Sequence, residues 1–353
     1  MTHPKVHIVY EYGIDTRPHS SSYIRLIRPL THPNLSKHLE TTFSPRLPAN
    51  NADIVIVDRL WRPDISPSLA YGLVDDIRSL RSRMIYTLDD NILDLAQERR
   101  DWPQERHLQA LRIFLQAADE VWVPTHALKE RLSDLSQSVL VIPNALDERL
   151  LCYRGPLISK SLFNNQPVII GMMGTRTHDQ DLLMIAPALH ELWWRYPGKF
   201  ELEIIGVTEK ENTLEMLSGL PVRLHNPPPE EQEYPLFQLW FSSSINWDIA
   251  LAPLTDTPFN RCKSDIKFLD YSAIGAAGIY SLMPPYRSTI EQSVTGLLVE
   301  NQTEAWIDAL EEYLNDEHLR LNISHKARQY LHTERTLAGS IDKWFEALLR
   351  VIE

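Results

Sequence analysis

The sequence predicts an α/β protein built from two successive parallel-sheet domains, and three observations support this prediction. Short apolar runs rich in β-branched residues alternate with longer segments of helical period, which is the pattern of a parallel α/β sheet. The pattern runs once, is interrupted between Asp147 and Pro167, and then starts again. The length of 353 residues suits two domains of about 150–190 residues better than a single one.

The first half of the chain contains the pattern of one sheet with helices between its strands. The predicted strands are Val6–Tyr10, Ile54–Asp58, Met84–Leu88, Val121–Pro124 and Val139–Ile142. The predicted helices are Ser22–Pro29, Ser66–Arg81, Gln104–Ala118 and Ala127–Ser133. Thr125 has the residue type of a helix N-cap for the last of these helices.

The interruption has the composition of a linker. Gly155-Pro156 and Asn164-Asn165 are turn-forming pairs without hydrophobic period around them. We therefore predict a linker at 155–165 and domains at 1–158 and 159–353, with the last helix able to pack back on the first domain.

The second half repeats the α/β pattern. The predicted strands are Val168–Met172, Leu202–Gly206, Val222–His225, Ile249–Pro253 and Gly278–Ser281. The predicted helices are Asp181–Tyr196, Glu231–Ser242, Ser264–Ile274, Glu304–Asn315, Glu317–Leu331 and Leu337–Ile352. Ligands of such sheets bind beyond the carboxyl ends of the strands, so we expect the site in a cleft between two facing domains.

Composition and missing motifs exclude several classes of function. The net charge of −12 disfavours nucleic acid as a partner. No apolar stretch is long enough to span a membrane and the N-terminus lacks a secretory pattern, so we expect a cytoplasmic protein. With 12 glycines, the chain has no G-x-G-x-x-G, P-loop or G-x-S-x-G motif. H-E-x-x-H and C-x-x-C are also absent, and two cysteines make neither a disulfide framework nor a zinc site.

A cationic helix start in the second half points to an anion. Ser264 is predicted to be the N-cap of a helix that ends at Gly275, and Arg261, Lys263 and Lys267 crowd its beginning. Cations there oppose the helix dipole, whereas a phosphate bound between them and the free N–H groups would be stabilising. The alternative is that the lysines reach into solvent or pair with acidic neighbours, which here are Asp256 and Asp265.

The same helix resembles a known family. Lys267-Phe-Leu-Asp-Tyr-Ser-Ala-Ile-Gly-Ala-Ala-Gly-Ile is similar to the K-x-L-E-Y-x-A-x-G-x-P-V-I segment of family 4 glycosyltransferases. The resemblance implies that Asp270 binds the ribose hydroxyls of a nucleotide. The carboxylate that contacts the donor sugar in that family is replaced here by Cys262, with Asn260 and Lys263 as candidate substitutes.

A second resemblance lies where the second half opens. Gly174-Thr175-Arg176 follows a strand and resembles the first loop of the family's donor domain, in which an arginine reaches the diphosphate. Gly174 would permit close approach of the backbone, and Arg176 would supply a forked phosphate donor. The alternative is a structural glycine turn followed by an exposed arginine.

Further segments resemble the family in the expected order. Residues 120–129 and 141–147 are similar to D-x-V-x-x-x-S-x-x-x-K and V-I-P-N-G-I-D. We expect these two segments to have structural roles and not catalytic ones. Residues 281–291 and 295–301 resemble S-x-x-G-G-x-x-E and N-G-x-L-V-x-x, although Pro284-Pro285 replaces the glycine pair. We place Tyr286 at the cleft. The matches extend over roughly residues 84–335.

Two strand ends of the first half supply candidates for the acceptor side. Gly13 lies in the first strand–helix loop, where the family uses a glycine to admit ligands. Asp89 and Asp90 follow the predicted strand Met84–Leu88 and would bind or orient an acceptor hydroxyl as candidate catalytic residues. The alternative for this pair is an Asx-type turn in which one aspartate caps the next helix.

Together, the resemblance implies a GT-B fold of two Rossmann-like domains and transfer of a hexose-type sugar from a nucleoside-diphosphate sugar, with retention of configuration. We expect no cofactor and no metal, because the donor domain carries its own cations. The expected acceptor is a glycan or lipid-linked molecule, in polysaccharide or glycoconjugate assembly, which would allow peripheral association with the inner face of the membrane. The rivals are a non-catalytic nucleotide-sugar or glycan-binding module, and an epimerase or phosphorylase of the same fold.

Overall fold

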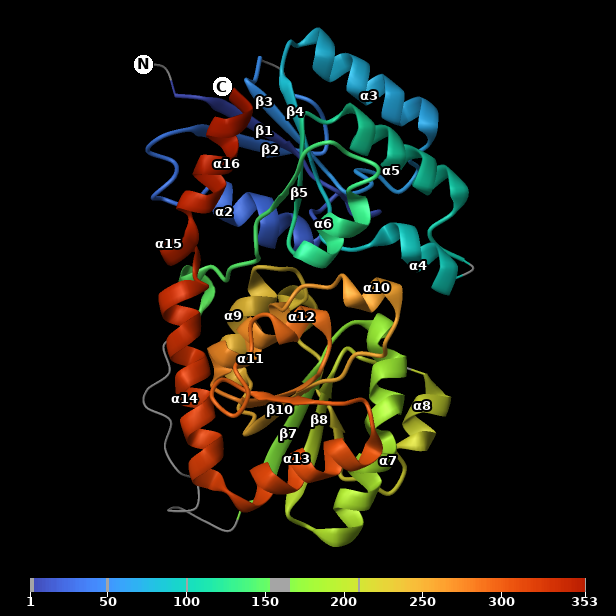
Figure 1. Ribbon diagram of the computed structural model, residues 1–353, viewed down its shortest axis with the longest axis vertical. Coiled ribbons are helices and arrows are strands. Elements are labelled where there is room, and N and C mark those ends of the chain that lie inside the picture. The colour runs from blue at the N-terminus through green and yellow to red at the C-terminus, as the bar shows by residue number, and fades with distance from the viewer. Residues whose placement is uncertain (1–2, 49–50, 100, 153–165, 209, 353) are drawn as a thin grey trace. The chain divides into compact units, whose positions relative to one another are not determined.

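The computed structural model describes residues 3–48, 51–99, 101–152, 166–208 and 210–352. The chain divides into two compact α/β units (Figure 1). The first comprises Met1–Glu148, Arg261–Ser264 and Thr336–Glu353, and the second comprises Arg149–Asn260 and Asp265–Arg335. The predicted linker at 155–165 and the boundary at 158 lie outside the described residues.

The first unit contains a parallel six-stranded sheet in the order β2-β1-β3-β4-β5-β6. Its strands are β1 Lys5–Val9, β2 Glu40–Ser44, β3 Ile54–Asp58, β4 Arg83–Thr87, β5 Glu120–Val123 and β6 Val139–Val141. Its helical segments are α1 Ser20–Ser22, a π-helical turn Tyr23–Ile27, α2 Arg28–Leu30, α3 Pro67–Ser79, α4 Ile92–Glu98, α5 Glu105–Ala117, α6 His126–Leu132, α15 Leu337–Ser340 and α16 Asp342–Ile352.

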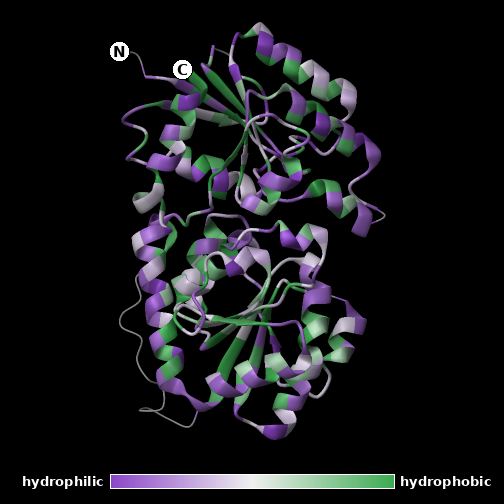
Figure 2. Ribbon diagram, in the orientation of Figure 1, coloured by the Kyte–Doolittle hydropathy of each residue, from purple (hydrophilic) through white to green (hydrophobic). Residues whose placement is uncertain are grey.

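Alternation along β3 explains how this sheet is covered on both faces. Val55 and Val57 pack into a core with α3 and α5, whereas Ile54 and Ile56 pack into a second core with α2 and α16. Successive strand residues point to opposite faces, so an uninterrupted apolar strand needs a helical layer on each side. Apolar strands and mixed helices are visible in Figure 2.

The second unit repeats the arrangement with a parallel sheet in the order β12-β11-β10-β7-β8-β9. Its strands are β7 Val168–Met173, β8 Phe200–Ile205, β9 Val222–Leu224, β10 Ile249–Ala252, β11 Ala277–Ser281 and β12 Leu297–Val299. Its helices are α7 Asp179–Arg195, α8 Glu211–Met216, α9 Leu236–Ser244, α11 Ile266–Ile274, α12 Pro284–Arg287, α13 Thr303–Asn315 and α14 Glu317–Glu334, and α10 Pro258–Arg261 precedes α11.

All ten predicted strands are present. The described residues also form β2 and β12, which the sequence analysis missed because their sequence patterns are weak. The edge strand β2 reads Glu-Thr-Thr-Phe-Ser and is largely exposed, so it lacks the apolar run of a buried strand. The other missed strand, β12, has three residues. Thr125 caps α6 as predicted, because its hydroxyl oxygen accepts the Leu128 amide at 3.2 Å. Within the described residues, no helix is both long and apolar enough to cross a membrane.

The predicted start of the cationic helix is wrong by one residue. The N-cap of α11 is Asp265, not Ser264, and Lys267 is therefore the second residue of the helix. The predicted end is correct, because Gly275 closes α11 in the left-handed conformation with φ of 75°.

Candidate functional site

The second sheet has a topological switch at β7. From β7 the chain continues to β8 on one side, while β10 lies on the other side. The connections leave the carboxyl ends of β7 and β10 in opposite directions, and open α/β sheets bind ligands at such a point. The residues that follow these two strands are therefore the first candidates for a ligand site in this unit.

Gly174 and Thr175 follow β7 at this point. A Cβ atom on Gly174 would lie only 2.8 Å from Cδ2 of His178, so a larger residue would displace that ring. Thr175 is exposed, and its hydroxyl lies 2.8 Å from that of Thr177. Arg176 opens the short 3₁₀ turn Arg176–His178, and its side chain is outside the described part of the structure.

Lys267 and Asp270 lie on one face of α11 and are both buried. The Nζ atom of Lys267 donates to the carbonyl oxygen of Met173 at 2.5 Å, directly ahead of Gly174. Burial raises the pKa of Asp270 to about 7, against the opposing effect of the Lys267 charge. The structure thus brings three of the predicted donor residues, Gly174, Lys267 and Asp270, to the end of one strand.

The alternative of a solvated lysine does not describe the surroundings of Lys267. A solvated lysine would be exposed, whereas Lys267 is 7% exposed. The Asp265 carboxylate accepts from both terminal nitrogens of Arg335, at 2.7 and 2.9 Å, and from the Thr289 hydroxyl at 2.7 Å. Arg335 is thus the ion-pair partner of Asp265.

The residues ahead of α11 are divided between the two units. Asn260 belongs to the second unit, where its side-chain amide donates to the carbonyl and hydroxyl oxygens of Thr255 at 2.9 and 3.0 Å. Lys263, which is half-buried, and Cys262 belong to the first unit. The Cys262 thiol is buried 3.4 Å from the side-chain nitrogen of Asn91, and burial raises its pKa.

The prediction that Tyr286 lines a cleft is wrong. Pro284-Pro285 opens the short helix α12, and the Tyr286 ring is 1% exposed. Its centroid lies 5.0 Å from that of Tyr280, which also contacts Phe268 and Tyr271. Aromatic packing places this ring in the core of the second unit.

In the first unit, polar groups gather where β1, β3 and β4 end. Arg59 follows β3 and lies between three carboxylates: its Nε is 2.7 Å from Glu11, and its terminal nitrogen is 2.8 Å from Asp89 and 3.8 Å from Asp90. The φ angle of Arg59 is 45°, a left-handed conformation that side chains rarely adopt. The two candidate residues Asp89 and Asp90 thus lie together after β4. Both carboxylates interact with Arg59, which the sequence analysis did not predict.

The alternative interpretation of Asp89 and Asp90 as helix caps is wrong. The next helix, α4, begins at Ile92 with Asn91 as its N-cap, and the Asn91 side chain accepts the Asp94 amide at 3.2 Å. Gly13 lies in the loop after β1, where an added Cβ would come no closer than 3.7 Å to Asp15. The structure therefore provides no local packing reason for a glycine at position 13.

Sequence reasoning missed Glu11, Asp58 and Arg59. Burial raises the pKa of Glu11, with the Arg59 charge acting in the opposite direction. Burial and then the Glu11 charge raise the pKa of Asp58 to about 7, while Ser22 donates a hydrogen bond to it. The rule that selected Asp89, polar residues at a strand end, applies equally to Asp58 and Arg59 after the buried strand β3 and would have found them.

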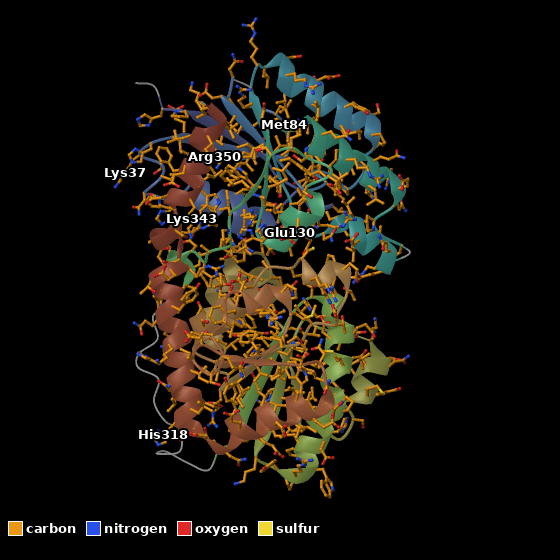
Figure 3. All side chains as sticks on the ribbon, in the orientation of Figure 1. Lys37, Met84, Glu130, His318, Lys343 and Arg350 are labelled. Carbon is orange, nitrogen blue, oxygen red and sulfur yellow. The ribbon has the colours of Figure 1, made fainter. Side chains whose placement is uncertain are left out.

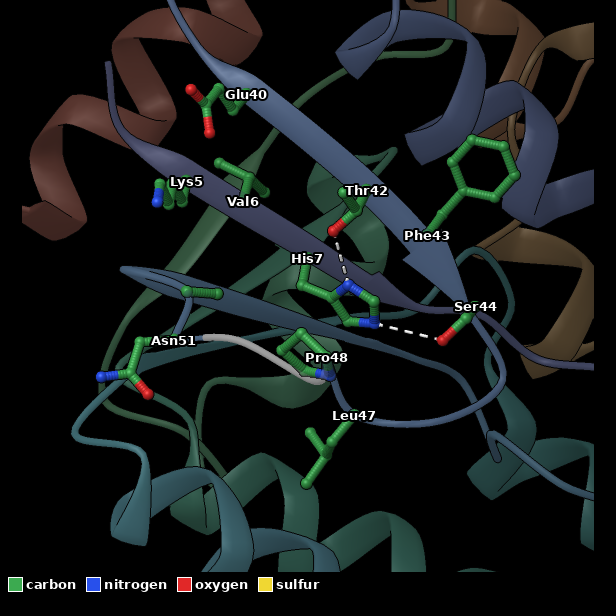
Figure 4. Close-up of a pocket in the computed structure, with 11 residues that line it drawn as sticks. Lys5, Val6, His7, Glu40, Thr42, Phe43, Ser44, Leu47, Pro48 and Asn51 are labelled. Atoms are coloured by element: carbon green, nitrogen blue, oxygen red, sulfur yellow. Dashed lines mark hydrogen bonds between the residues drawn. The ribbon is translucent and has the colours of Figure 1, made fainter. Parts of the chain in front are cut away.

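A separate pocket of about 380 Å³ lies along β1 and β2 (Figure 4). The His7 ring lies between Thr42 and Ser44, with Nδ1 2.7 Å from the Thr42 hydroxyl, and Nε2 donates to the Arg46 carbonyl at 2.8 Å. Both ring nitrogens are thus engaged, and burial lowers the pKa of His7. No predicted site residue lines this pocket.

Of three comparisons with known proteins, the one with solved structures shows the fold. No family model matches the chain, and no curated protein matches its sequence. Among solved structures, HepE from Anabaena in complex with UDP-glucose aligns with a TM-score of 0.67 and 12% identity, over 99% of this chain and 100% of that one.

Two further solved structures also align with most of this chain. A glycosyltransferase from Rickettsia africae aligns with a TM-score of 0.64 and 14% identity, over 100% of this chain and 99% of that one. Sucrose-phosphate synthase from Thermosynechococcus elongatus aligns with a TM-score of 0.63 and 14% identity, over 85% and 74%. With its two six-stranded parallel α/β units, the chain has the GT-B fold of these glycosyltransferases.

Proposed function

We propose that the protein is a glycosyltransferase that moves a hexose-type sugar from a nucleoside-diphosphate sugar to an acceptor hydroxyl. The observation that carries this proposal is the buried Lys267–Asp270 pair beside the Met173 carbonyl, at the end of β7 where an open α/β sheet binds its ligand. The HepE structures are complexes with UDP and UDP-glucose, and we propose a UDP-sugar as the donor.

In this proposal the second unit binds the donor. Asp270 accepts hydrogen bonds from the ribose hydroxyls, because a carboxylate offers several acceptor sites for neighbouring O–H donors. Gly174, Thr175, Arg176 and Lys267 surround the diphosphate, whose growing charge such preorganised groups stabilise. Asn260 and Lys263 take the place of the family's sugar-binding carboxylate.

The first unit supplies the acceptor side, with Asp89 and Asp90 orienting the attacking hydroxyl and Gly13 in the adjoining loop. Arg59 holds Asp89 at 2.8 Å and leaves the two aspartates partly exposed, which suits a hydrogen bond to a ligand. We further propose retention of configuration, no metal requirement, and a glycan or lipid-linked acceptor in polysaccharide or glycoconjugate assembly. An acceptor of the lipid-linked kind would bring the protein to the inner face of a membrane.

A coupled assay tests the reaction. The protein is incubated with a panel of UDP-sugars and candidate glycan acceptors, with and without EDTA, and released UDP is measured. We expect UDP release that requires the acceptor and continues in EDTA. Binding of UDP without any release would favour the non-catalytic module, and release that requires phosphate instead of an acceptor would favour a phosphorylase.

Replacing Asp270 tests the donor site directly. Asp270→Asn keeps the shape and removes the charge, so we expect UDP affinity to fall by about 1–3 kcal/mol, the range for charged hydrogen bonds. The matched control is Asp308→Asn, an exposed position on α13 of the same unit. Titration calorimetry with UDP gives the comparison, and a folded Asp270→Asn variant with unchanged affinity would exclude the ribose contact.

A further inference from the structure

A buried glutamine lies beside the candidate ribose contact. Gln238 of α9 is 1% exposed, and Asp270 of α11 is 6% exposed. Burial raises the pKa of the Asp270 carboxyl to about 7, while the Lys267 charge and the neighbouring Gln238 amide act in the opposite direction. Since Gln238 and Asp270 come from different helices, their contact depends on the packing of α9 against α11.

Aromatic rings join these two helices close to the contact. The ring centroid of Phe241 on α9 lies 5.5 Å from that of Trp247, which in turn lies 5.8 Å from that of Tyr271 on α11. Phe241 lies about one turn after Gln238 on α9, and Tyr271 directly follows Asp270. The backbones that carry the amide and the carboxyl are therefore held in place, so the two side chains face each other across a packed interface between helices.

The amide of Gln238 has hydrogen-bonding capacity that the surrounding protein does not use. Its Nε2 atom is buried and has no hydrogen-bond partner among the residues that the structure describes. A buried donor without an acceptor lowers stability, so such a group calls for an explanation. An ionised carboxylate can accept about four hydrogen bonds, and the nearby Asp270 carboxylate is thus a suitable acceptor for this donor.

We propose that Gln238 is a positioning residue that donates a hydrogen bond from Nε2 to one oxygen of Asp270, so that the other oxygen accepts from the ribose of the donor. This inference rests on the proposed function, in which Asp270 binds the ribose. Hydrogen bonds within active sites are often long before substrate binds and shorten in the complex. The amide also stabilises the ionised carboxylate, which is the form that accepts from ribose hydroxyls. Gln238 therefore acts through Asp270 and need not touch the nucleotide.

The proton affinity of Asp270 supplies a readout that a purely structural glutamine would not change. Among the described residues, Lys267 on the same helix and Gln238 on α9 are the groups that act on this carboxyl. Its neighbour Tyr271 stays uncharged, because burial raises the pKa of that phenol. Loss of the Gln238 amide should raise the pKa of Asp270 further. Fewer molecules would then carry the ionised carboxylate at pH 7, whereas most would still carry it at pH 9.

Titration calorimetry with UDP at pH 7 and pH 9 tests this role. Gln238→Met keeps the length of the side chain and removes the donor. We expect it to weaken UDP binding about fivefold at pH 7 and less than about twofold at pH 9, relative to the wild type at the same pH. Comparison at equal pH cancels the titration of UDP itself. Gln329→Met changes an exposed glutamine of α14 and should match the wild type at both pH values.

A double variant separates positioning from an independent effect. Because Gln238 acts through the carboxylate, adding Gln238→Met to Asp270→Asn should change UDP affinity by less than about twofold. A loss that is equal at both pH values, or that adds in full to the loss in Asp270→Asn, would overturn the inference. Unchanged UDP affinity in a folded Gln238→Met variant would also overturn it.

A shorter amide keeps the test decisive if Gln238→Met does not fold. Gln238→Asn retains the amide but withdraws it by one methylene, so it should show a loss with the same pH dependence. If Asp270→Asn weakens UDP binding and neither Gln238 variant does, this inference fails while the proposed function stands. If the wild type does not bind UDP, or if Asp270→Asn binds it equally well, the ribose contact of the proposed function fails and this inference fails with it.

Discussion

At the scale of single residues, Asp58 shows how burial changes the proton affinity of a carboxylate. Its carboxylate is 1% exposed at the end of β3 and accepts from the Ser22 hydroxyl and the Glu11 amide. Burial, followed by the nearby Glu11 charge, raises its pKa to about 7 from 3.8. The folded protein therefore binds a proton on Asp58 at pH values where the unfolded chain has lost it.

The sign of the resulting pH dependence follows from linkage. Between about pH 4 and pH 7 the folded state holds this extra proton, so the free energy of unfolding falls as pH rises, by at most roughly 1.4 kcal/mol per pH unit for one proton. We expect Asp58→Asn to reduce the loss of stability between pH 5 and pH 7. Urea denaturation at pH 5 and at pH 7 measures the free energy of unfolding of the wild type and of the variant.

The control for this prediction is Asp53→Asn. Asp53 is exposed immediately before the same strand, and its carboxylate accepts from the Lys5 amide at 2.7 Å. This variant should keep the wild-type difference between the two pH values. A pH profile of Asp58→Asn that matches the wild type would contradict the raised pKa.

At the scale of elements, α11 illustrates how a helix end is encoded. Gly275 ends the helix at φ of 75°, a conformation that costs other residues about 1–2 kcal/mol. Gly275→Ala should therefore lower the free energy of unfolding by about that amount. Urea denaturation without ligand provides the measurement.

A second glycine supplies the matched control. Gly72 lies inside α3, and a Cβ there would meet no atom within 4 Å. Gly72→Ala should raise stability by roughly 0.5–1 kcal/mol, because glycine is costly inside a helix. Equal effects of the two substitutions would contradict the left-handed requirement at Gly275.

At the scale of the whole molecule, the chain does not divide at one point. After the second unit, α15 and α16 belong to the first one. Trp344 of α16 is fully buried, and its indole nitrogen donates to the Arg25 carbonyl at 3.0 Å. The same helix carries the exposed Lys343 and Arg350 (Figure 3). The last helix is thus a structural part of the unit that contains the N-terminus.

Truncating this tryptophan tests that assignment. Trp344→Ala should destabilise the first unit by about 3–5 kcal/mol, the usual cost of a large-to-small change in a core. Hydrogen exchange should accelerate in β1 and β3, which share a core with Trp344, and less in β7 and β8. The Lys343→Gln variant serves as the surface control. Equal acceleration of hydrogen exchange in both units would contradict the assignment of α16 to the first unit.

The candidate donor site was partly predictable from the sequence, although its residues come from segments far apart in the chain. Gly174 and the pair Lys267 and Asp270 each lie in a short segment with its own strand-end or helix pattern, so local rules selected them. The burial of the Lys267 side chain was not predictable from its own segment, because it depends on Met173, 94 positions away. For the same reason, no local pattern placed Tyr286 in the core, where it packs on Tyr280.

The sequence by itself determined the fold class, the ten apolar strands and the glycine that ends α11, because periodicity and backbone preference act over a few residues. Only the tertiary structure decided which charges meet. Arg59 joins Glu11 and Asp89 from three strands, and Asp181 joins His178 to Thr255, because parallel strands bring distant strand ends to one edge. Burial then shifts the proton affinity of the carboxylates gathered there, and burial is a property of the packed sheet rather than of any segment.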